Sequence, residues 1–342
     1  MDPSPTASDA PPAPQPARLA IVCPCFNEAP TVARFHAELA SVLRGLPEVD
    51  ARVLFVDDGS SDGTLEVLEG LARQDPQVAV TAFSRNFGHQ VAVSAGLELS
   101  AGADAVVVLD SDLQHPPAVI PELLARWRAG AEVVLAVRKR TQGASLLKRA
   151  SSAGFYKLFN RLSETKIREG AADFYLLSGR VREVLASMPE RSRFMRGLVA
   201  WVGFRRDHVE FDAPERAGGE SKYTLRRMLS MALDAVFSFS VTPIRLATRA
   251  GLGVVLLGGA YLAYVLVRYF VYEDLVQGWA SLISVTMILG GAQLMFIGLI
   301  GEYVARGYSE SKARPLYVLA RPLAGPLWTS PPAADRAHGP HA

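Results

Sequence analysis

The chain has 342 residues, of which 49 % are hydrophobic and 20 % are charged. This composition excludes an intrinsically disordered chain, and the length suggests more than one structural unit. The 36 basic and 34 acidic residues leave a net charge of only +2. Such a balance argues against a nucleic-acid partner, because proteins that bind nucleic acid through bulk electrostatics are usually far more basic.

The chain contains only two cysteines, Cys23 and Cys25. They cannot build a disulfide framework, so a reducing compartment fits this sequence best. A C-x-C pair could form half of a metal site, but no second Cys pair is present to complete one. We therefore expect two small buried side chains.

The two ends of the chain are rich in proline. Residues 1–17 contain six prolines and almost no large apolar side chain, which predicts a disordered tail. This tail has neither the basic nor the apolar region of a signal peptide. Residues 322–342 are similarly rich in Pro and Ala. Between the two tails, we expect a globular domain over residues 18–223 and a membrane region after it.

The first expected strand covers residues 19–23 and precedes a helix over 31–43. Strands at 52–56, 78–83, 105–109 and 132–137 follow, with helices that end near Gln74 and cover 91–100. Strands that alternate with helices predict an α/β fold with a mostly parallel sheet. Ligands of such sheets bind beyond the carboxyl ends of the strands.

Polar segments follow the first three expected strands. The first segment is P-C-F-N-E and ends at Glu28, and the third is S-R-N-F-G-H and ends at His89. In the second, D-D-G-S-S-D-G-T, Asp62 or Thr64 can cap the following helix. That leaves Asp57 and Asp58 to accept hydrogen bonds from a base or a ribose.

Asp110-Ser111-Asp112 follows the fourth expected strand. Residues two apart in an extended segment point the same way, so the two carboxylates would lie together. Such hard oxygen ligands suit Mg²⁺ or Mn²⁺, which in turn binds a diphosphate. Gln114 and His115 could join this site. Taken alone, the D-x-D pattern is equally compatible with a solvated turn.

Two apolar runs, 250–267 and 279–300, lie near the C-terminus; the first continues to Tyr272 beyond Arg268. About 20 helical residues cross a hydrocarbon core of roughly 30 Å. We therefore expect a two-helix transmembrane hairpin over residues 249–304. Two buried core helices are the alternative, which the short acidic connection Glu273-Asp274 disfavours.

Basic residues flank the expected hairpin on both sides, whereas its connecting loop is acidic. The positive-inside rule then predicts a multi-pass protein of the inner (cytoplasmic) membrane, with the globular domain and both termini in the cytoplasm. The cytoplasmic tail would cover residues 305–342. Residues 224–248 predict interfacial amphipathic helices, with a helix ended or kinked at Pro243; an ordinary surface helix is the alternative.

The joint pattern resembles glycosyltransferase family 2, which has the GT-A fold. It is carried by P-C-F-N-E, V-D-D-G-S-S-D-G-T, R-N-F-G-H and L-D-S-D-L-Q-H-P-P, followed by G-A-A-D-F, R-F-M-R-G and W-V-G-F. Within this family, the chain looks like the polyprenyl-phosphate glycosyltransferases: dolichyl-phosphate mannose synthase and the bacterial undecaprenyl-phosphate glucosyltransferases. The resemblance covers about residues 18–318.

The resemblance implies roles for individual residues. Asp112 and Asp173 would be catalytic, and Asp110, Asp112 and Gln114 would hold Mg²⁺ or Mn²⁺. The donor nucleotide-sugar would contact Pro24, Phe26, Glu28, Asp57, Asp58, Arg85 and Asp110. The phosphates and the acceptor would contact Arg138, Arg149, Ser152, Arg216, Ser221 and Lys222. For Asp173, a structural carboxylate paired with an Arg remains an alternative, and a solvated charge run remains one for Arg138.

The implied reaction is inverting transfer of a hexose from a UDP-glucose or GDP-mannose type donor to undecaprenyl phosphate. It would occur on the cytoplasmic face of the lipid bilayer and supply lipid-linked sugar for cell-envelope glycan modification. A family 2 transferase with another acceptor and an inactive, membrane-tethered nucleotide-binding module are the alternatives. The small membrane footprint of two helices is compatible with a homo-oligomer.

Overall fold

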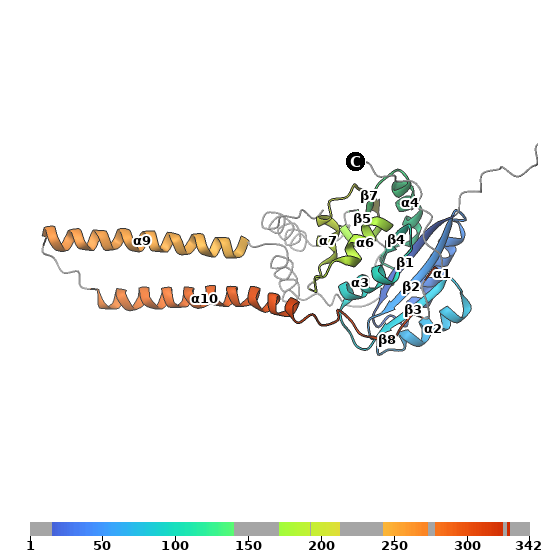
Figure 1. The fold of residues 1–342 in the computed structure, drawn as a ribbon, viewed down its shortest axis with the longest axis horizontal. Coiled ribbons are helices and arrows are strands. Elements are labelled where there is room, and N and C mark those ends of the chain that lie inside the picture. Colours follow the sequence, from blue (N-terminus) through green and yellow to red (C-terminus); the bar gives the residue numbers. More distant parts are fainter. Residues whose placement is uncertain are drawn as a thin grey trace, which may run out of the picture.

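The computed structural model describes residues 16–139, 171–191, 193–212, 242–272, 278–323 and 327–328. These residues form an α/β domain from which two long helices extend to one side (Figure 1). The predicted tails over 1–17 and 322–342 lie almost entirely outside the described residues.

Eight strands form one mixed sheet in the order β7-β5-β6-β4-β1-β2-β3-β8. β1 pairs in parallel with β2 and β4, and parallel pairs also join β2 to β3 and β5 to β7. β6 runs antiparallel between β4 and β5, and β8 runs antiparallel to β3. The predicted α/β class with a mostly parallel sheet is confirmed. The strands are β1 Ala17–Cys25, β2 Val49–Asp57, β3 Val78–Phe83, β4 Ala105–Val108, β5 Val133–Arg138, β6 Ala171–Ser178, β7 Arg206–Phe211 and β8 Leu319–Arg321.

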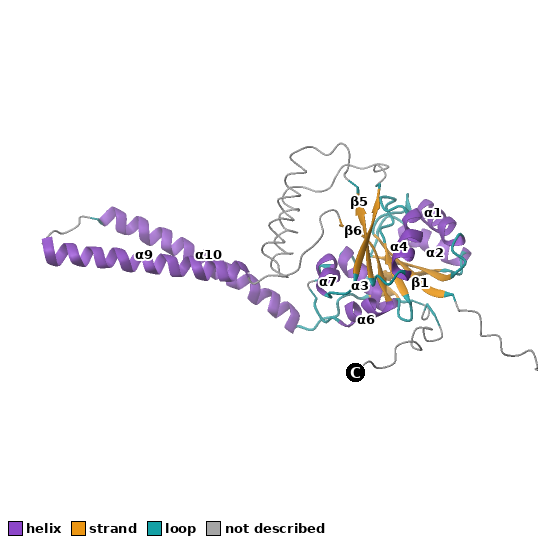
Figure 2. Ribbon diagram, turned by 90° about the horizontal axis from the view of Figure 1, so that it is seen from above, coloured by secondary structure: helices purple, strands orange, loops and turns teal. Residues whose placement is uncertain are grey.

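Helices cover both faces of the sheet (Figure 2). α1, α2 and α4 pack on one face over a single hydrophobic cluster. α3, α6 and α7 pack on the other face, over two hydrophobic clusters that α3 shares. A sheet buried on both faces explains why β1 and β4 read as continuous apolar runs. The helices of this domain are α1 Val32–Arg44, α2 Thr64–Gln74, α3 His89–Leu99, the 3₁₀ turn η1 Pro117–Val119, α4 Ile120–Arg128, α6 Gly179–Ser187 and α7 Met195–Trp201.

Helix α1 illustrates how the sequence builds these layers. Its buried residues are Val32, Phe35, Leu39 and Leu43, which recur every three or four positions and so form one apolar stripe. Phe35 meets Phe55 of β2 edge-on, with ring centroids 6.3 Å apart. The stripe therefore places α1 against the sheet and leaves its charged face in water.

Two long helices form the C-terminal hairpin, α9 Thr242–Tyr272 and α10 Trp279–Ser311. Large apolar side chains on both are exposed, for example Leu257 and Met295. By length and composition, the described residues contain one helix able to cross a membrane, Val285–Ser311. The predicted second crossing therefore stays a prediction.

The described part of α9 overlaps the predicted interfacial segment. Residues 242–248 are helical and continuous with the rest of α9, and Pro243 lies in the first described turn of this helix. Residues 224–241 lie outside the described part of the chain, so the interfacial helices stay a prediction.

Candidate active site

The carboxyl ends of β1, β2 and β4 meet at one edge of the sheet. In the parallel register, Cys25 of β1 is opposite Asp57 of β2, and Val22 of β1 is opposite Val108 of β4. The polar segments that follow these strands therefore converge, as expected for a ligand site of a parallel sheet. Cys23 and Cys25 are free and buried, and burial raises the pKa of both thiols, so both are unreactive.

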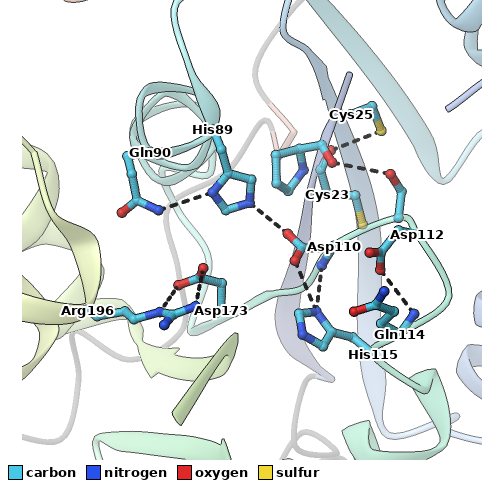
Figure 3. A network of polar contacts seen from close by, with 12 residues as sticks. Cys23, Cys25, His89, Gln90, Asp110, Asp112, Gln114, His115, Asp173 and Arg196 are labelled. Atoms are coloured by element: carbon cyan, nitrogen blue, oxygen red, sulfur yellow. Dashed lines mark hydrogen bonds and ion pairs between the residues drawn. The ribbon is translucent and has the colours of Figure 1, made fainter. Parts of the chain in front are cut away.

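Asp110 lies at the centre of a polar network (Figure 3). Its Oδ1 atom is 2.7 Å from Nε2 of His89, the first residue of α3. Its backbone N–H donates to Nδ1 of His115 at 3.1 Å. Burial opposes ionisation of Asp110, but the hydrogen bond and charge of His89 outweigh it and lower the pKa of Asp110 below its ordinary value. Asp110 is therefore held as a carboxylate.

The two histidines of this network have different surroundings. Burial disfavours a charged His89, yet the hydrogen bond to Asp110 and the charges of Asp110 and Asp173 raise the pKa of His89 to about 9. His115 is 1 % exposed and lies against Phe174, with ring centroids 5.4 Å apart. Burial lowers the pKa of His115, so its ring is a neutral support for the D-S-D turn.

Asp112 and Gln114 complete the turn that Asp110 begins. Asp112 Oδ1 accepts the backbone N–H of Gln114 at 3.0 Å, and Gln114 Oε1 accepts a hydrogen bond from Arg138 at 3.3 Å. The other oxygen of Asp112 has no hydrogen bond to any described residue. Leu113 adopts the left-handed conformation (φ 63°), which helps close the turn between Asp112 and Gln114.

The chemistry of this donor set fits a hard divalent cation. Two carboxylates and one amide oxygen come from a single turn, and oxygen ligands of this kind suit Mg²⁺ or Mn²⁺. No group of three or more His, Cys, Asp or Glu among the described residues could hold a metal by itself. The turn can therefore supply part of a coordination shell, with the remainder left for substrate phosphates and water.

Asp57 and Asp58 are both buried but differ in their partners. The two oxygens of Asp58 accept backbone N–H groups of Phe87 and Gly88, the shortest at 2.7 Å. In contrast, Asp57 Oδ2 accepts the N–H of Ser60 at 3.2 Å, and Asp57 Oδ1 is buried without a hydrogen-bond partner among the described residues. Asp58 thus holds the loop after β3, whereas Asp57 has an acceptor oxygen to spare.

The loop after β1 is joined to the loop after β2. Asn27 N–H donates to Ser60 at 2.9 Å, and Glu28 N–H donates to Thr64 at 2.9 Å. Pro24 is buried in β1, and its carbonyl accepts the hydroxyl of Ser111. Phe26 is 45 % exposed beside them, so its ring is available for a ligand.

Glu28 and Arg85 stand at the margins of this edge. Burial and the charges of Asp112 and Asp110 raise the pKa of Glu28, opposed by a hydrogen bond from Thr31. Arg85 is exposed and lies over the ring of Phe87, 4.0 Å from its centroid. Both residues are therefore close to the acidic turns but remain accessible.

Asp173 of β6 forms a bidentate ion pair with Arg196 of α7. The two hydrogen bonds, from Nε and Nη2, measure 2.7 and 2.8 Å. This pairing is the structural alternative that the sequence leaves open for Asp173. Gln90 links the same helix to the D-S-D network, because it accepts the N–H of Met195 at 2.8 Å and lies 3.1 Å from His89.

Five predicted residues lie outside the described part of the chain, and their roles stay predictions. They are Arg149, Ser152, Arg216, Ser221 and Lys222. Conversely, sequence reasoning assigned no role to His89, Gln90 or Arg196. Two motifs, R-N-F-G-H and R-F-M-R-G, contain His89 and Arg196, but only the folded chain brings these residues to Asp110 and Asp173.

Two family models match the chain. Glycosyl transferase family 2 matches residues 20–181, and the GtrB C-terminal hairpin matches residues 242–306. The bactoprenol glucosyl transferase of Shigella phage SfV is 39 % identical over 302 residues, which are 88 % of this chain and 98 % of that protein. A prophage bactoprenol glucosyl transferase homolog of Escherichia coli K12 is 38 % identical over 304 residues, 89 % of this chain and 99 % of its own.

Among solved structures, mannosyl-3-phosphoglycerate synthase of Rubrobacter xylanophilus has a TM-score of 0.45 at 20 % identity. The similarity covers 69 % of this chain and 75 % of that one, and is too distant to carry a functional argument.

The edge of the sheet at which β1, β2 and β4 end carries Asp57, Asp58, Asp110 and Asp112, and we name it the acidic edge. The fold, this acidic edge and the relatives together define a glycosyltransferase. The chain belongs to glycosyltransferase family 2 and carries the C-terminal hairpin of the GtrB type.

Proposed function

We propose that this protein is an undecaprenyl-phosphate glucosyltransferase, which moves glucose from a nucleotide-sugar to the lipid phosphate. The observation that carries the proposal is the combination, in one chain, of an acidic edge at the ends of β1, β2 and β4 with the GtrB-type hairpin. The names of the relatives support bactoprenol as the acceptor and glucose as the sugar.

The donor would bind at the acidic edge. Phe26 offers an exposed ring to the base, and the spare oxygen of Asp57 can accept a hydrogen bond from the nucleoside. Asp110, Asp112 and Gln114 would hold Mg²⁺ or Mn²⁺, which when bound neutralises the negative charge of the leaving diphosphate. Arg138, which reaches Gln114, adds a fixed positive charge beside the same phosphates.

The acceptor needs little activation. The second pKa of a phosphate is about 6, so a polyprenyl phosphate is already ionised near pH 7 and can attack without a strong general base. Direct attack on the face opposite the leaving group would invert the anomeric carbon. Arg149, Ser152, Arg216, Ser221 and Lys222 are proposed to hold the two anions together against their repulsion.

Asp173 is proposed to orient a substrate from the side of the Asp110 network where Arg196 of α7 lies. Its pairing with Arg196 keeps a carboxylate in place near His89, whose pKa it helps to raise. A carboxylate fixed in this way can orient a sugar hydroxyl or the acceptor. The role proposed for it is orientation, because the acceptor phosphate is already ionised.

The hairpin is proposed to anchor the enzyme in the inner membrane. Exposed apolar side chains along α9 and α10 would be stabilised in a bilayer, and the basic flanks favour a cytoplasmic catalytic domain and cytoplasmic termini. Lipid-linked glucose made there would supply cell-envelope glycan modification. The protein is proposed to act alone or as a homo-oligomer.

Release of nucleoside diphosphate tests this proposal. Purified protein with UDP-glucose should release UDP only when both undecaprenyl phosphate and Mg²⁺ or Mn²⁺ are present. Release that depends on another acceptor would indicate a different family 2 transferase. Nucleotide binding without release under any acceptor would indicate an inactive, membrane-tethered module.

A further inference from the structure

The chain returns from the hairpin to the catalytic domain through a short segment, residues 312–321, which we name the C-terminal strap. After α10 the strap crosses to the edge of the sheet, where it adds β8 beside β3 (Figure 1). Ser84 N–H donates to the carbonyl of Val318 at 2.9 Å, and the Thr81 hydroxyl donates to the carbonyl of Arg321 at 2.8 Å. The strap is therefore paired to β3 up to Ser84. This residue is the first of the loop over residues 84–88, which we name the donor-side loop.

Arg191, between α6 and α7, fixes the point at which the strap starts. Its backbone N–H donates to the carboxylate of Glu310 in the last turn of α10, at 2.9 and 3.1 Å. Its Nε donates to the carbonyl of Arg314 at 2.8 Å. Its Nη1 donates to the carbonyl of Glu310 at 3.3 Å, and a guanidinium on the final carbonyls of a helix stabilises the C-terminus of that helix. The strap thus begins at a defined place on the catalytic domain.

Tyr317 is the largest side chain that the strap places against the domain. Its ring stacks on Phe83 with centroids 5.0 Å apart, and its hydroxyl donates to Glu98 at 2.8 Å. Phe83 in turn meets Phe87 edge-on at 5.6 Å, and Arg85 covers the ring of Phe87. Three aromatic rings, one stacked pair and one edge-on pair, therefore form a continuous set of contacts from the strap to the loop over residues 84–88; we name this set the stack Tyr317–Phe83–Phe87.

This loop contributes directly to the acidic edge. Its last residues, Phe87 and Gly88, donate their N–H groups to Asp58, and the residue that follows, His89, holds Asp110. Contacts on both sides hold the loop: Asp58 from the site, and from the strap the Val318 carbonyl on Ser84 and Tyr317 through Phe83. Loss of either support would leave the loop with more conformations to give up when a ligand binds.

We propose that Tyr317 is a positioning residue that holds the donor-side loop through the stack Tyr317–Phe83–Phe87. The role rests on the proposed function, in which the donor binds at this edge. The segment just beyond the membrane hairpin would thereby pre-order the site for the nucleotide-sugar. Because the stack reaches the donor side of the site, its loss affects donor binding and leaves acceptor binding unchanged.

Kinetics of the full-length protein test the role with three variants. Tyr317→Ala removes the ring and should raise the KM for UDP-glucose at least about fivefold, with the KM for undecaprenyl phosphate within about twofold of wild type. Tyr317→Phe keeps the stack and should restore the donor KM. Tyr308→Ala is the matched control, because Tyr308 is exposed on α10, its ring touches Lys312, and it has no hydrogen bond, ion pair or ring contact with a described residue of the catalytic domain. An equal change in both KM values, or none, would overturn the proposal.

Hydrogen exchange read by mass spectrometry tests the same coupling without any reaction. Amides of residues 84–88 should exchange faster in Tyr317→Ala than in wild type, Tyr317→Phe or Tyr308→Ala, while those of β1 keep their protection. Unchanged exchange in the loop would refute the coupling. A wild-type protein that transfers no sugar would count against the proposed function, and the exchange comparison would still decide on the strap.

Discussion

Asp110 and Asp112 lie two residues apart, yet their carboxylates have different hydrogen-bond partners. Asp110 is occupied by His89 and lies close to His115, whereas one oxygen of Asp112 is left without a partner among the described residues. Asp112 is thus the carboxylate most available to a cation. The pair shows how a short motif can combine one anchored and one open ligand.

Asp112→Asn should lower the transfer rate at least about tenfold, which corresponds to about 1.4 kcal/mol in barrier or binding. The amide keeps the shape of the side chain but removes the anionic ligand. Rates measured with Mg²⁺ and with Mn²⁺ check the prediction. Asp207→Asn, on the partly exposed edge strand β7, is the control. Near-normal turnover of Asp112→Asn would refute the metal assignment.

Asp173 and Arg196 should act as a unit in a double-mutant cycle. Bidentate, partly buried ion pairs lose more when one partner is removed than when both are, because a single removal leaves a charge unpaired. We expect Asp173→Ala and Arg196→Ala to be non-additive by about 1–3 kcal/mol in unfolding free energy. Denaturant titration of the four proteins gives this coupling. Additive effects would show that the two side chains are energetically independent.

At the scale of elements, close contact between α3 and β1 positions His89. A Cβ atom on Gly96 of α3 would lie 2.1 Å from Cγ1 of Val22 in β1, so only glycine allows this approach. The separation between helix and strand therefore depends on a missing side chain. Since His89 begins the same helix, the contact also sets the distance from His89 to Asp110.

Gly96→Ala should destabilise the protein by about 1–3 kcal/mol, because the added methyl group overpacks a full interface. Gly70→Ala in α2 is the matched control: its Cβ would meet only the end of Arg73, at 3.9 Å. There the gain in helix propensity should stabilise by about 0.5–1 kcal/mol. Thermal unfolding of both variants checks the difference. Equal effects would contradict the packing argument.

The sequence predicts strands β1 to β5 to within a few residues, because each is a short apolar run followed by polar residues. It does not predict β6, β7 or β8, since their places depend on pairing partners far along the chain. The register that brings Asp57, Asp110 and Phe26 together follows from the parallel topology, so that part of the site could be predicted. The Asp173–Arg196 pair could not, because it joins a strand to a later helix through tertiary packing alone.

For the whole molecule, we expect both flanks of the hairpin to face the cytoplasm. Single cysteines at 274 and 312, in a background with Cys23 and Cys25 replaced by alanine, can be labelled in intact cells with an impermeant reagent. Position 274 should be labelled from outside and position 312 should be protected, because the basic flanks favour the inner side. Labelling of 312 and not of 274 would reverse the topology.

The proposed membrane anchor also predicts where the lipid acceptor binds. A lipid phosphate stays at headgroup depth, and Lys222 precedes the hairpin closely enough in sequence to reach that depth. Charge-assisted contacts to phosphate contribute roughly 1.5–3 kcal/mol each. Lys222→Met should therefore raise the KM for polyprenyl phosphate about ten- to a hundredfold and leave donor binding nearly unchanged. A collapse of donor affinity alone would assign Lys222 to the diphosphate.

The mass of the lipid product shows most directly whether the protein transfers glucose to undecaprenyl phosphate. Purified protein is incubated with undecaprenyl phosphate, Mg²⁺ or Mn²⁺ and a panel of nucleotide-sugars that includes UDP-glucose and GDP-mannose. We expect one new lipid species, heavier than undecaprenyl phosphate by a single glucose residue and formed from UDP-glucose. A lipid that stays unmodified with every donor, while sugar passes to another acceptor or to none, would contradict this expectation.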